Sequence, residues 1–196
     1  MPLKLPRLGF TLLELLIVIA IIALLAVVIF FLLSPAEQLA KSRDTGRTNE
    51  VNQLGKAMNA YGLNSPLSAY ATEGDSWITT LFGAGEISSI PTEIAYAGSP
   101  PTLPLGICQV NICYDASDPA SNRAPFVIYT ALEARANRSA GSPGQTAWIT
   151  YSSLRGGSSV IFTDSCSSPG PDLSPVPIIP CGGGGTPPPA TNTPPP

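Results

Sequence analysis

The side chains that enzymes most often use for chemistry are sparse in this chain. Its 196 residues contain no histidine, which excludes histidine-based catalytic triads and histidine metal sites. The four cysteines follow C-x4-C and C-x14-C spacings, and neither spacing is a zinc-binding pattern. The glycine run 182–185 has no lysine and no following helix that would complete a phosphate-binding loop. We therefore expect a protein that is not an enzyme and that uses no cofactor.

Two carboxylates are candidates for a metal site. Asp115 and Asp118 lie close together in the sequence and near Asn122, and oxygen ligands of this kind suit Ca²⁺. The adjoining proline and serines favour an ordinary turn over a metal-binding loop. We expect no metal here, and calcium at Asp115 and Asp118 remains the alternative.

One further carboxylate, Glu14, lies in an unusual place. The 24 residues from Phe10 to Leu33 are apolar except for Thr11 and Glu14. A helix of this length spans about 36 Å, enough to cross a hydrocarbon core of about 30 Å. An ionisable group in such a helix costs about 2–3 kcal/mol unless it reaches the interface or a partner. The sequence therefore predicts a membrane helix whose one carboxylate needs a partner.

The stretch G-F-T-L-L-E-L-L-I-V-I-A-I-I-A-L-L-A, which begins at Gly9, resembles the class III signal of type IV pilins and type II secretion pseudopilins. The resemblance implies that a prepilin peptidase cleaves after Gly9 and that the new N-terminal residue, Phe10, is N-methylated. It also implies that Glu14 meets the terminal amine of a neighbouring subunit during assembly. A cation at short range would stabilise a desolvated carboxylate, which agrees with this role. The alternative is an ordinary signal anchor with a stray glutamate.

The sequence divides into five parts. We expect a cleaved leader at 1–9, a transmembrane and assembly helix at 10–33, an amphipathic helix at 34–62, an extracytoplasmic globular domain at 63–181 and a glycine- and proline-rich tail at 182–196. Residues 125–132, 146–151 and 159–163 are rich in β-formers and are separated by glycine-containing turns. The expected fold class is α+β, with a long N-terminal helix packed on an antiparallel sheet of three or four strands and a disordered tail. The resemblance implies the same fold.

The boundary between the two expected helices lies at Ser34 and Pro35. Proline within a helix removes a hydrogen bond and produces a kink. Pro35 also suits the first position of a second helix, with Ser34 as its N-cap. The sequence leaves these two interpretations open.

The second expected helix has an apolar stripe and several charges. Val51, Leu54, Met58 and Tyr61 follow steps of three and four residues, so one helix face can pack on a sheet. The charged residues of this helix fit a solvated face or ion pairs between subunits; they are Lys41, Arg43, Asp44, Arg47 and Glu50. Further along the chain, the pattern at residues 75–83 predicts a short helix, and the side chains of Trp77 and Leu81 would pack it against the core.

The even number of cysteines in an exported domain favours disulfides. In one straight strand, Cys108 and Cys113 would point to opposite faces. In a hairpin that turns at Val110 and Asn111 they would face each other within disulfide range, and we predict this pair. A bond between Cys166 and Cys181 would close a proline-rich loop that resembles the C-terminal disulfide loop of many pilins. We predict this second pair as well.

Charge and topology limit the partners. The chain has a net charge of −3, and loss of Lys4 and Arg7 with the leader would leave 8 basic and 13 acidic residues, a charge of −5. We expect no nucleic acid partner, because such binding depends on neutralising phosphates. The resemblance implies a single-pass membrane protein with a cytoplasmic leader and an outer domain, which becomes part of an extracellular filament.

The function that the resemblance implies is that of a structural subunit of a type IV pilus. Its partners would be the prepilin peptidase, identical or related pilin subunits, the inner-membrane assembly platform and membrane lipid before assembly. The alternatives are a type II secretion pseudopilin, a minor tip pilin, or a membrane-anchored binding module that never polymerises.

Overall fold

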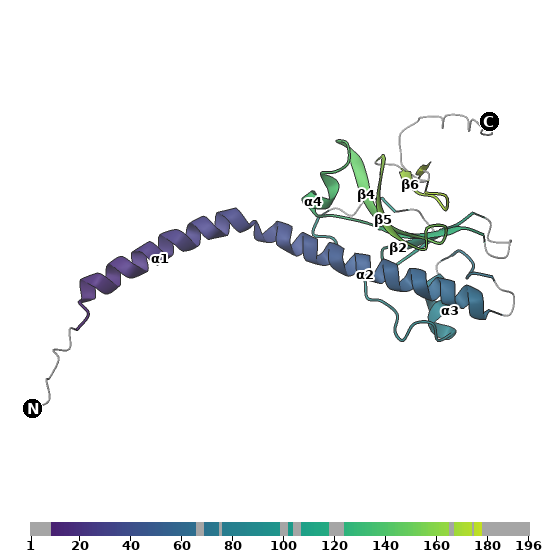
Figure 1. Cartoon of the computed structure of the whole chain (residues 1–196), viewed down its shortest axis with the longest axis horizontal. Coiled ribbons are helices and arrows are strands. Elements are labelled where there is room, and N and C mark those ends of the chain that lie inside the picture. Colours follow the sequence, from purple (N-terminus) through teal and green to yellow (C-terminus); the bar gives the residue numbers. More distant parts are fainter. Residues whose placement is uncertain are drawn as a thin grey trace, which may run out of the picture. The chain divides into compact units, whose positions relative to one another are not determined.

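In the computed structural model, the described residues are 9–65, 69–74, 76–98, 102–103, 107–117, 124–164, 167–173 and 175–177 (Figure 1). The chain divides into two compact units, 1–39 and 40–196. Most of the expected leader (1–8) and the whole expected tail (182–196) lie outside the described residues.

The first unit contains helix α1 (Leu12–Leu33) and the start of α2 (Pro35–Asn64). Helix α1 ends at Leu33, and the following residue Ser34 has a φ of 40° and a ψ of 74°, which are left-handed and outside the helical region. The next helix begins with Pro35 as its first residue, and the Ser34 carbonyl accepts hydrogen bonds from the N–H groups of Glu37 and Gln38. Of the two interpretations left open by the sequence, the structure has the one in which Pro35 starts a new helix.

The second unit contains most of α2 and a five-stranded antiparallel sheet in the order β1-β2-β3-β4-β5. The strands are β1 (Cys108–Gln109), β2 (Ile112–Ala116), β3 (Phe126–Ala131), β4 (Gln145–Ser152) and β5 (Gly157–Asp164). A separate pair joins β6 (Ser167–Pro169) to β7 (Pro175–Pro177), and the two short helices are α3 (Trp77–Gly83) and α4 (Arg135–Arg138). The α+β class is confirmed. The sheet has one strand more than expected, because the first arm of the 108–113 hairpin forms a two-residue strand.

The two faces of the sheet carry different cores because side chains alternate along each strand. On one face, Phe126, Ile128 and Tyr151 pack with Leu54 and Met58 of α2. On the other face, the core consists of Cys113, Val127, Tyr129, Ala131 and Trp148, with Leu173 packed against it. Figure 1 shows α2 along one side of the sheet and β6 on the other.

The stripe predicted for α2 is the stripe that packs on the sheet. Val51, Leu54 and Met58 are at most 1 % exposed, and Tyr61 packs at the edge of the same core. Helix and sheet approach closely at Gly55, where a Cβ atom would lie 2.2 Å from Cγ of Tyr151. This contact requires glycine, because any side chain would overlap the ring.

The predicted short helix is also present as α3. Trp77, Ile78 and Leu81 are fully buried, so the helix attaches the connection after α2 to the core. The N–H of Ile78 donates to Oε1 of Gln109 over 2.6 Å, which links the first turn of α3 to the β1–β2 hairpin.

Candidate functional site

Helix α1 has the surface of a helix that needs an apolar environment. None of its 22 residues is buried, and its mean hydropathy reaches 3.6. It is the one helix among the described residues that is long and apolar enough to cross a membrane. Its side chains therefore remain available for lipid or for other helices.

The first turn of α1 explains how a single chain accommodates Glu14. Oε2 of Glu14 accepts hydrogen bonds from the Thr11 N–H and the Thr11 hydroxyl, each over 2.9 Å. In return, the Glu14 N–H donates to Oγ1 of Thr11 over 3.2 Å. This arrangement is a capping box, in which two residues satisfy each other's backbone donors at a helix start. The carboxylate thus has partners within its own chain, and the T-x-x-E spacing in the sequence was a signal for them.

The predicted cleavage point lies just before this cap. Gly9 and Phe10 precede the helix, and the Phe10 side chain is 80 % exposed. A Cβ atom added at Gly9 would meet nothing within 4 Å. Gly9 and Phe10 are thus exposed among the described residues, and a terminal amine made at Phe10 would lie four residues before Glu14.

Comparison with known families agrees with this geometry. Residues 6–30 match the family model described as the prokaryotic N-terminal methylation motif. The N-terminus carries the class III signal of the type IV pilin and pseudopilin family. No curated protein and no solved structure gives a significant match to the chain. The pilin-type signal points to a structural protein, and it spans the predicted cleavage point, the capping box and most of α1.

The first predicted disulfide is present in the structure. Cys108 and Cys113 are bonded and lie opposite each other in the β1–β2 hairpin. The turn residues Val110 and Asn111 have φ values of 45° and 65°, as a two-residue primed turn requires. The Asn111 carbonyl accepts from the Thr130 hydroxyl over 2.7 Å, which helps to hold this conformation. The predicted Cys166–Cys181 pair lies outside the described residues.

The candidate calcium residues are only partly described. Asp115 lies on β2, and Asp118 lies outside the described residues. Burial, together with the neighbouring carboxyls of Glu73 and Asp172, raises the pKa of Asp115 to about 7. No three acidic, cysteine or histidine side chains within the described residues form a group that could hold a metal ion.

The structure also contains a polar cluster that the sequence interpretation missed. The side chains of Asp44 and Arg47 are only 2 % exposed, so they do not belong to a solvated helix face. Oδ1 of Asp44 accepts from Nη1 of Arg47 over 2.9 Å and from the Glu133 N–H over 3.0 Å. Oδ2 accepts from the Ala134 N–H over 2.9 Å and from Nδ2 of Asn137 over 2.7 Å. We call these five residues the Asp44 clasp.

Arg47 extends the clasp to the connection before the sheet. Its Nη2 donates to the carbonyls of Ile94 and Ala95 over 3.1 and 3.2 Å, and the guanidinium lies 3.9 Å from the centre of the Tyr96 ring. Arg43 adds an ion pair to Glu133. The positions of Asp44 and Arg47 continue the spacing of Val51, Leu54 and Met58, so helical periodicity was the available signal for their burial.

Proposed function

We propose that this protein is a structural subunit of a type IV pilus, processed by a prepilin peptidase and assembled through α1. The observation that carries the proposal is the pilin-type signal on a helix with no buried residue. A long apolar surface of this kind suits lipid before assembly and neighbouring α1 helices afterwards. The subunit is held in the membrane by α1, with its second unit on the outer side. A type II secretion pseudopilin has the same signal and is the alternative within the family.

The proposed assembly step uses Glu14 and the amine that cleavage creates on Phe10. In the single chain, the Glu14 carboxylate makes hydrogen bonds to Thr11 and has no cation beside it within the described residues. The amine of a neighbouring subunit would supply a positive charge in an apolar setting, where such an attraction is stronger than in water. The same contact repeated from copy to copy would produce an open filament.

The test compares Glu14→Ala with Thr11→Ala in cells that contain the cognate peptidase and assembly platform. Both variants lose the capping box, but only Glu14→Ala loses the carboxylate. We expect both to be cleaved and inserted, and only Glu14→Ala to lose incorporation into filaments sheared from the cells. Mass spectrometry of the N-terminus reports cleavage and methylation of Phe10. Normal filament yield from Glu14→Ala, or a membrane chain that retains residues 1–9, would refute the proposal.

A further inference from the structure

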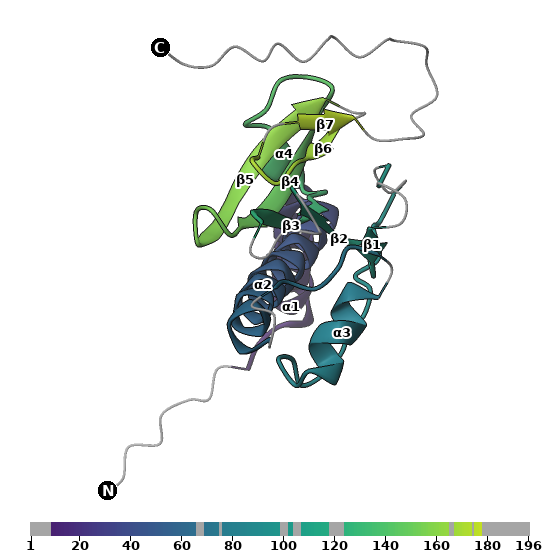
Figure 2. The same ribbon diagram turned by 90° about the vertical axis from the view of Figure 1, so that its right-hand side faces the viewer.

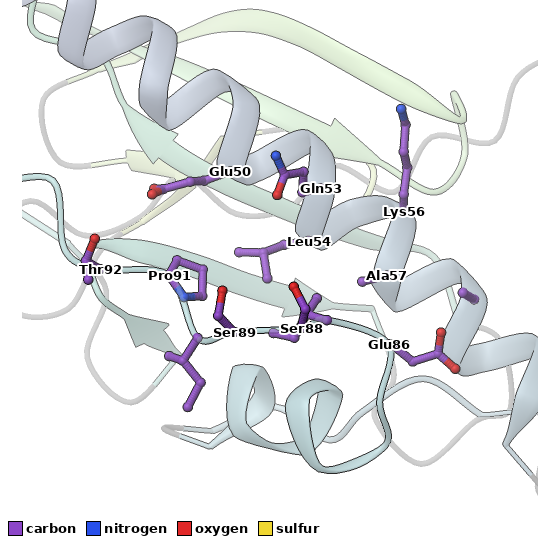
Figure 3. Close-up of a pocket in the computed structure, with 13 residues that line it drawn as sticks. Glu50, Gln53, Leu54, Lys56, Ala57, Glu86, Ser88, Ser89, Pro91 and Thr92 are labelled. Atoms are coloured by element: carbon purple, nitrogen blue, oxygen red, sulfur yellow. The ribbon is translucent and has the colours of Figure 1, made fainter.

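The second unit has a preformed groove beside α2. The groove encloses about 880 Å³ and lies between α2 residues 50–60 and the segment 86–92. Figure 3 shows Leu54 and Ala57 extending from α2 toward Ser88 and Ser89, while Lys56 points away from this segment. Leu54 and Ala57 are almost fully buried at the base of the groove, and the exposed apolar side chain of its lining is Ile90 on the far wall. We call this feature the α2 groove.

The far wall of the α2 groove is attached at both ends. Oε1 of Glu86 accepts from Nδ2 of Asn64 over 2.9 Å, and Oε1 of Glu93 accepts from Nδ2 of Asn111 over 2.6 Å. Ile87 packs against the main core. Because the wall is fixed to α2 and to the disulfide hairpin, a partner would not have to order it on binding.

Three charged residues line the groove, the acids Glu50 and Glu86 and the base Lys56, so its net charge is −1. Glu50 and Glu86 lie at its two ends (Figure 3). Burial raises the pKa of Glu50 and the nearby Arg47 opposes this rise, so Glu50 already has a cation close to it. Glu86 has the Asn64 amide as its partner and forms no ion pair within the described residues. A partner that fits this groove would bring an apolar side chain and one cation near Glu86.

The turn between β4 and β5 carries that pair of side chains. Leu154 is 62 % exposed, and the exposed Arg155 follows it directly. The turn is fixed, because the Gly156 N–H donates to the Ser152 carbonyl over 2.9 Å and the Ser153 N–H donates to the Phe126 carbonyl over 3.0 Å. A rigid turn that presents an apolar side chain loses little entropy on docking.

We propose that the Leu154–Arg155 turn of one copy docks in the α2 groove of another copy, with Leu154 against the exposed Ile90 of the far wall and Arg155 beside Glu86. Figure 2 shows the β4–β5 turn and α3 on opposite sides of α2, so one copy presents the turn and the groove in different directions. A contact between two different surfaces of identical copies is heterologous and continues along a filament. The inference rests on the proposed function, because it names a contact between polymerising subunits.

The direct test places a photoreactive benzoyl-phenylalanine at position 154 of the full chain in filament-forming cells. A second, epitope-tagged copy supplies the acceptor, and mass spectrometry identifies the cross-linked peptide. We expect attachment to 50–60 or 86–92 of the acceptor. The matched control carries the same residue at Val160, an exposed apolar position on β5, and should not label these segments. Filaments whose position-154 cross-links fall elsewhere would overturn the inference and leave the proposed function intact. A wild-type chain that forms no polymer would overturn both.

Charge reversal supplies an independent measurement. Arg155→Glu and Glu86→Arg should each lower the yield of sheared filaments by about fivefold, the upper range for a surface ion pair. The double variant should recover most of this yield, because it restores the pair with the charges exchanged. Asp164→Arg, which reverses an exposed acid outside the groove lining, is the control and should not rescue Arg155→Glu. Equal yields from all variants, or no recovery in the double variant, would contradict the proposed contact.

Discussion

Replacing Asp44 by asparagine tests whether the Asp44 clasp stabilises the second unit. Asparagine has nearly the same size as aspartate, so the substitution creates no cavity. It removes the charge that faces Arg47 and leaves the guanidinium with Oε2 of Glu133, 3.5 Å from Nη2, as its nearest carboxylate. If the amide oxygen keeps the Oδ1 position, the amide NH₂ faces two donors, the Ala134 N–H and Nδ2 of Asn137.

The expected loss follows from these contacts. Removing one partner of a buried ion pair costs about 3–5 kcal/mol. Each buried donor left without an acceptor costs about 1–3 kcal/mol, but these terms overlap because one side chain causes them all. We expect Asp44→Asn to lower the free energy of unfolding by about 3–4 kcal/mol, a large part of the roughly 5–15 kcal/mol of a typical domain.

Urea unfolding of the full chain in detergent measures this loss. Trp77 and Trp148, the two tryptophans of the chain, are both fully buried in the second unit, so their fluorescence reports its unfolding. With a slope of about 2 kcal/mol per molar urea, the midpoint should fall by about 1.5–2 M. Lys41→Asn, an exposed charge on the same helix, should change the free energy of unfolding by less than about 0.5 kcal/mol. Equal midpoints for Asp44→Asn and Lys41→Asn would refute the reasoning.

The same urea titration tests three other features. Gly55→Ala should lower the free energy of unfolding by about 2 kcal/mol, because the new methyl group would overlap the Tyr151 ring. An unchanged urea midpoint would contradict this contact. Replacing both Cys108 and Cys113 by serine should lower the free energy of unfolding by about 2 kcal/mol, the loop-entropy value for a separation of five residues. A single Cys108→Ser variant as stable as the wild type would show that the bond contributes nothing to stability. The raised pKa of Asp115 means that the folded state holds its proton more tightly than the unfolded state, so stability should fall as pH rises from about 4 to about 7. The full shift corresponds to about 4 kcal/mol, and solvent screening of this half-exposed group reduces the expectation to about 1–2 kcal/mol. Asp115→Asn should flatten this part of the profile, and an identical slope in the variant would assign it to another group.

Much of the fold was predictable because it depends on local patterns. The Val51–Leu54–Met58 stripe identified the face of α2 that packs on the sheet, since helical periodicity alone determines which side chains share a face. The spacing of Cys108 and Cys113 predicted the hairpin and its register, because only a turn at Val110 and Asn111 brings the two cysteines together. The pilin-type signal was readable for the same reason, as its residues are contiguous.

The features that were missed depend on contacts between distant segments. The sequence pattern predicted Asp44 and Arg47 to be surface charges, because it does not show that the backbone N–H groups of Glu133 and Ala134 lie beside Asp44. The α2 groove depends on the path of 86–92, a segment without helix or strand. The Thr11–Glu14 capping box was different, since its spacing was visible and only the assumption that Glu14 needs an outside partner concealed it.

The Asp44 clasp has a mechanical consequence for a subunit under tension. A pull on α1 passes along the chain into the start of α2, where Pro35, Ala36 and Leu39 are exposed. Along this helix, Arg43 and then Asp44 supply side-chain hydrogen bonds that join α2 to the strand-connecting segment at 133–137. Hydrogen bonds resist displacement over a few tenths of an ångström, whereas apolar contacts yield gradually. The clasp, together with the Arg43–Glu133 ion pair, would therefore bear the load before the apolar stripe behind it separates from the sheet.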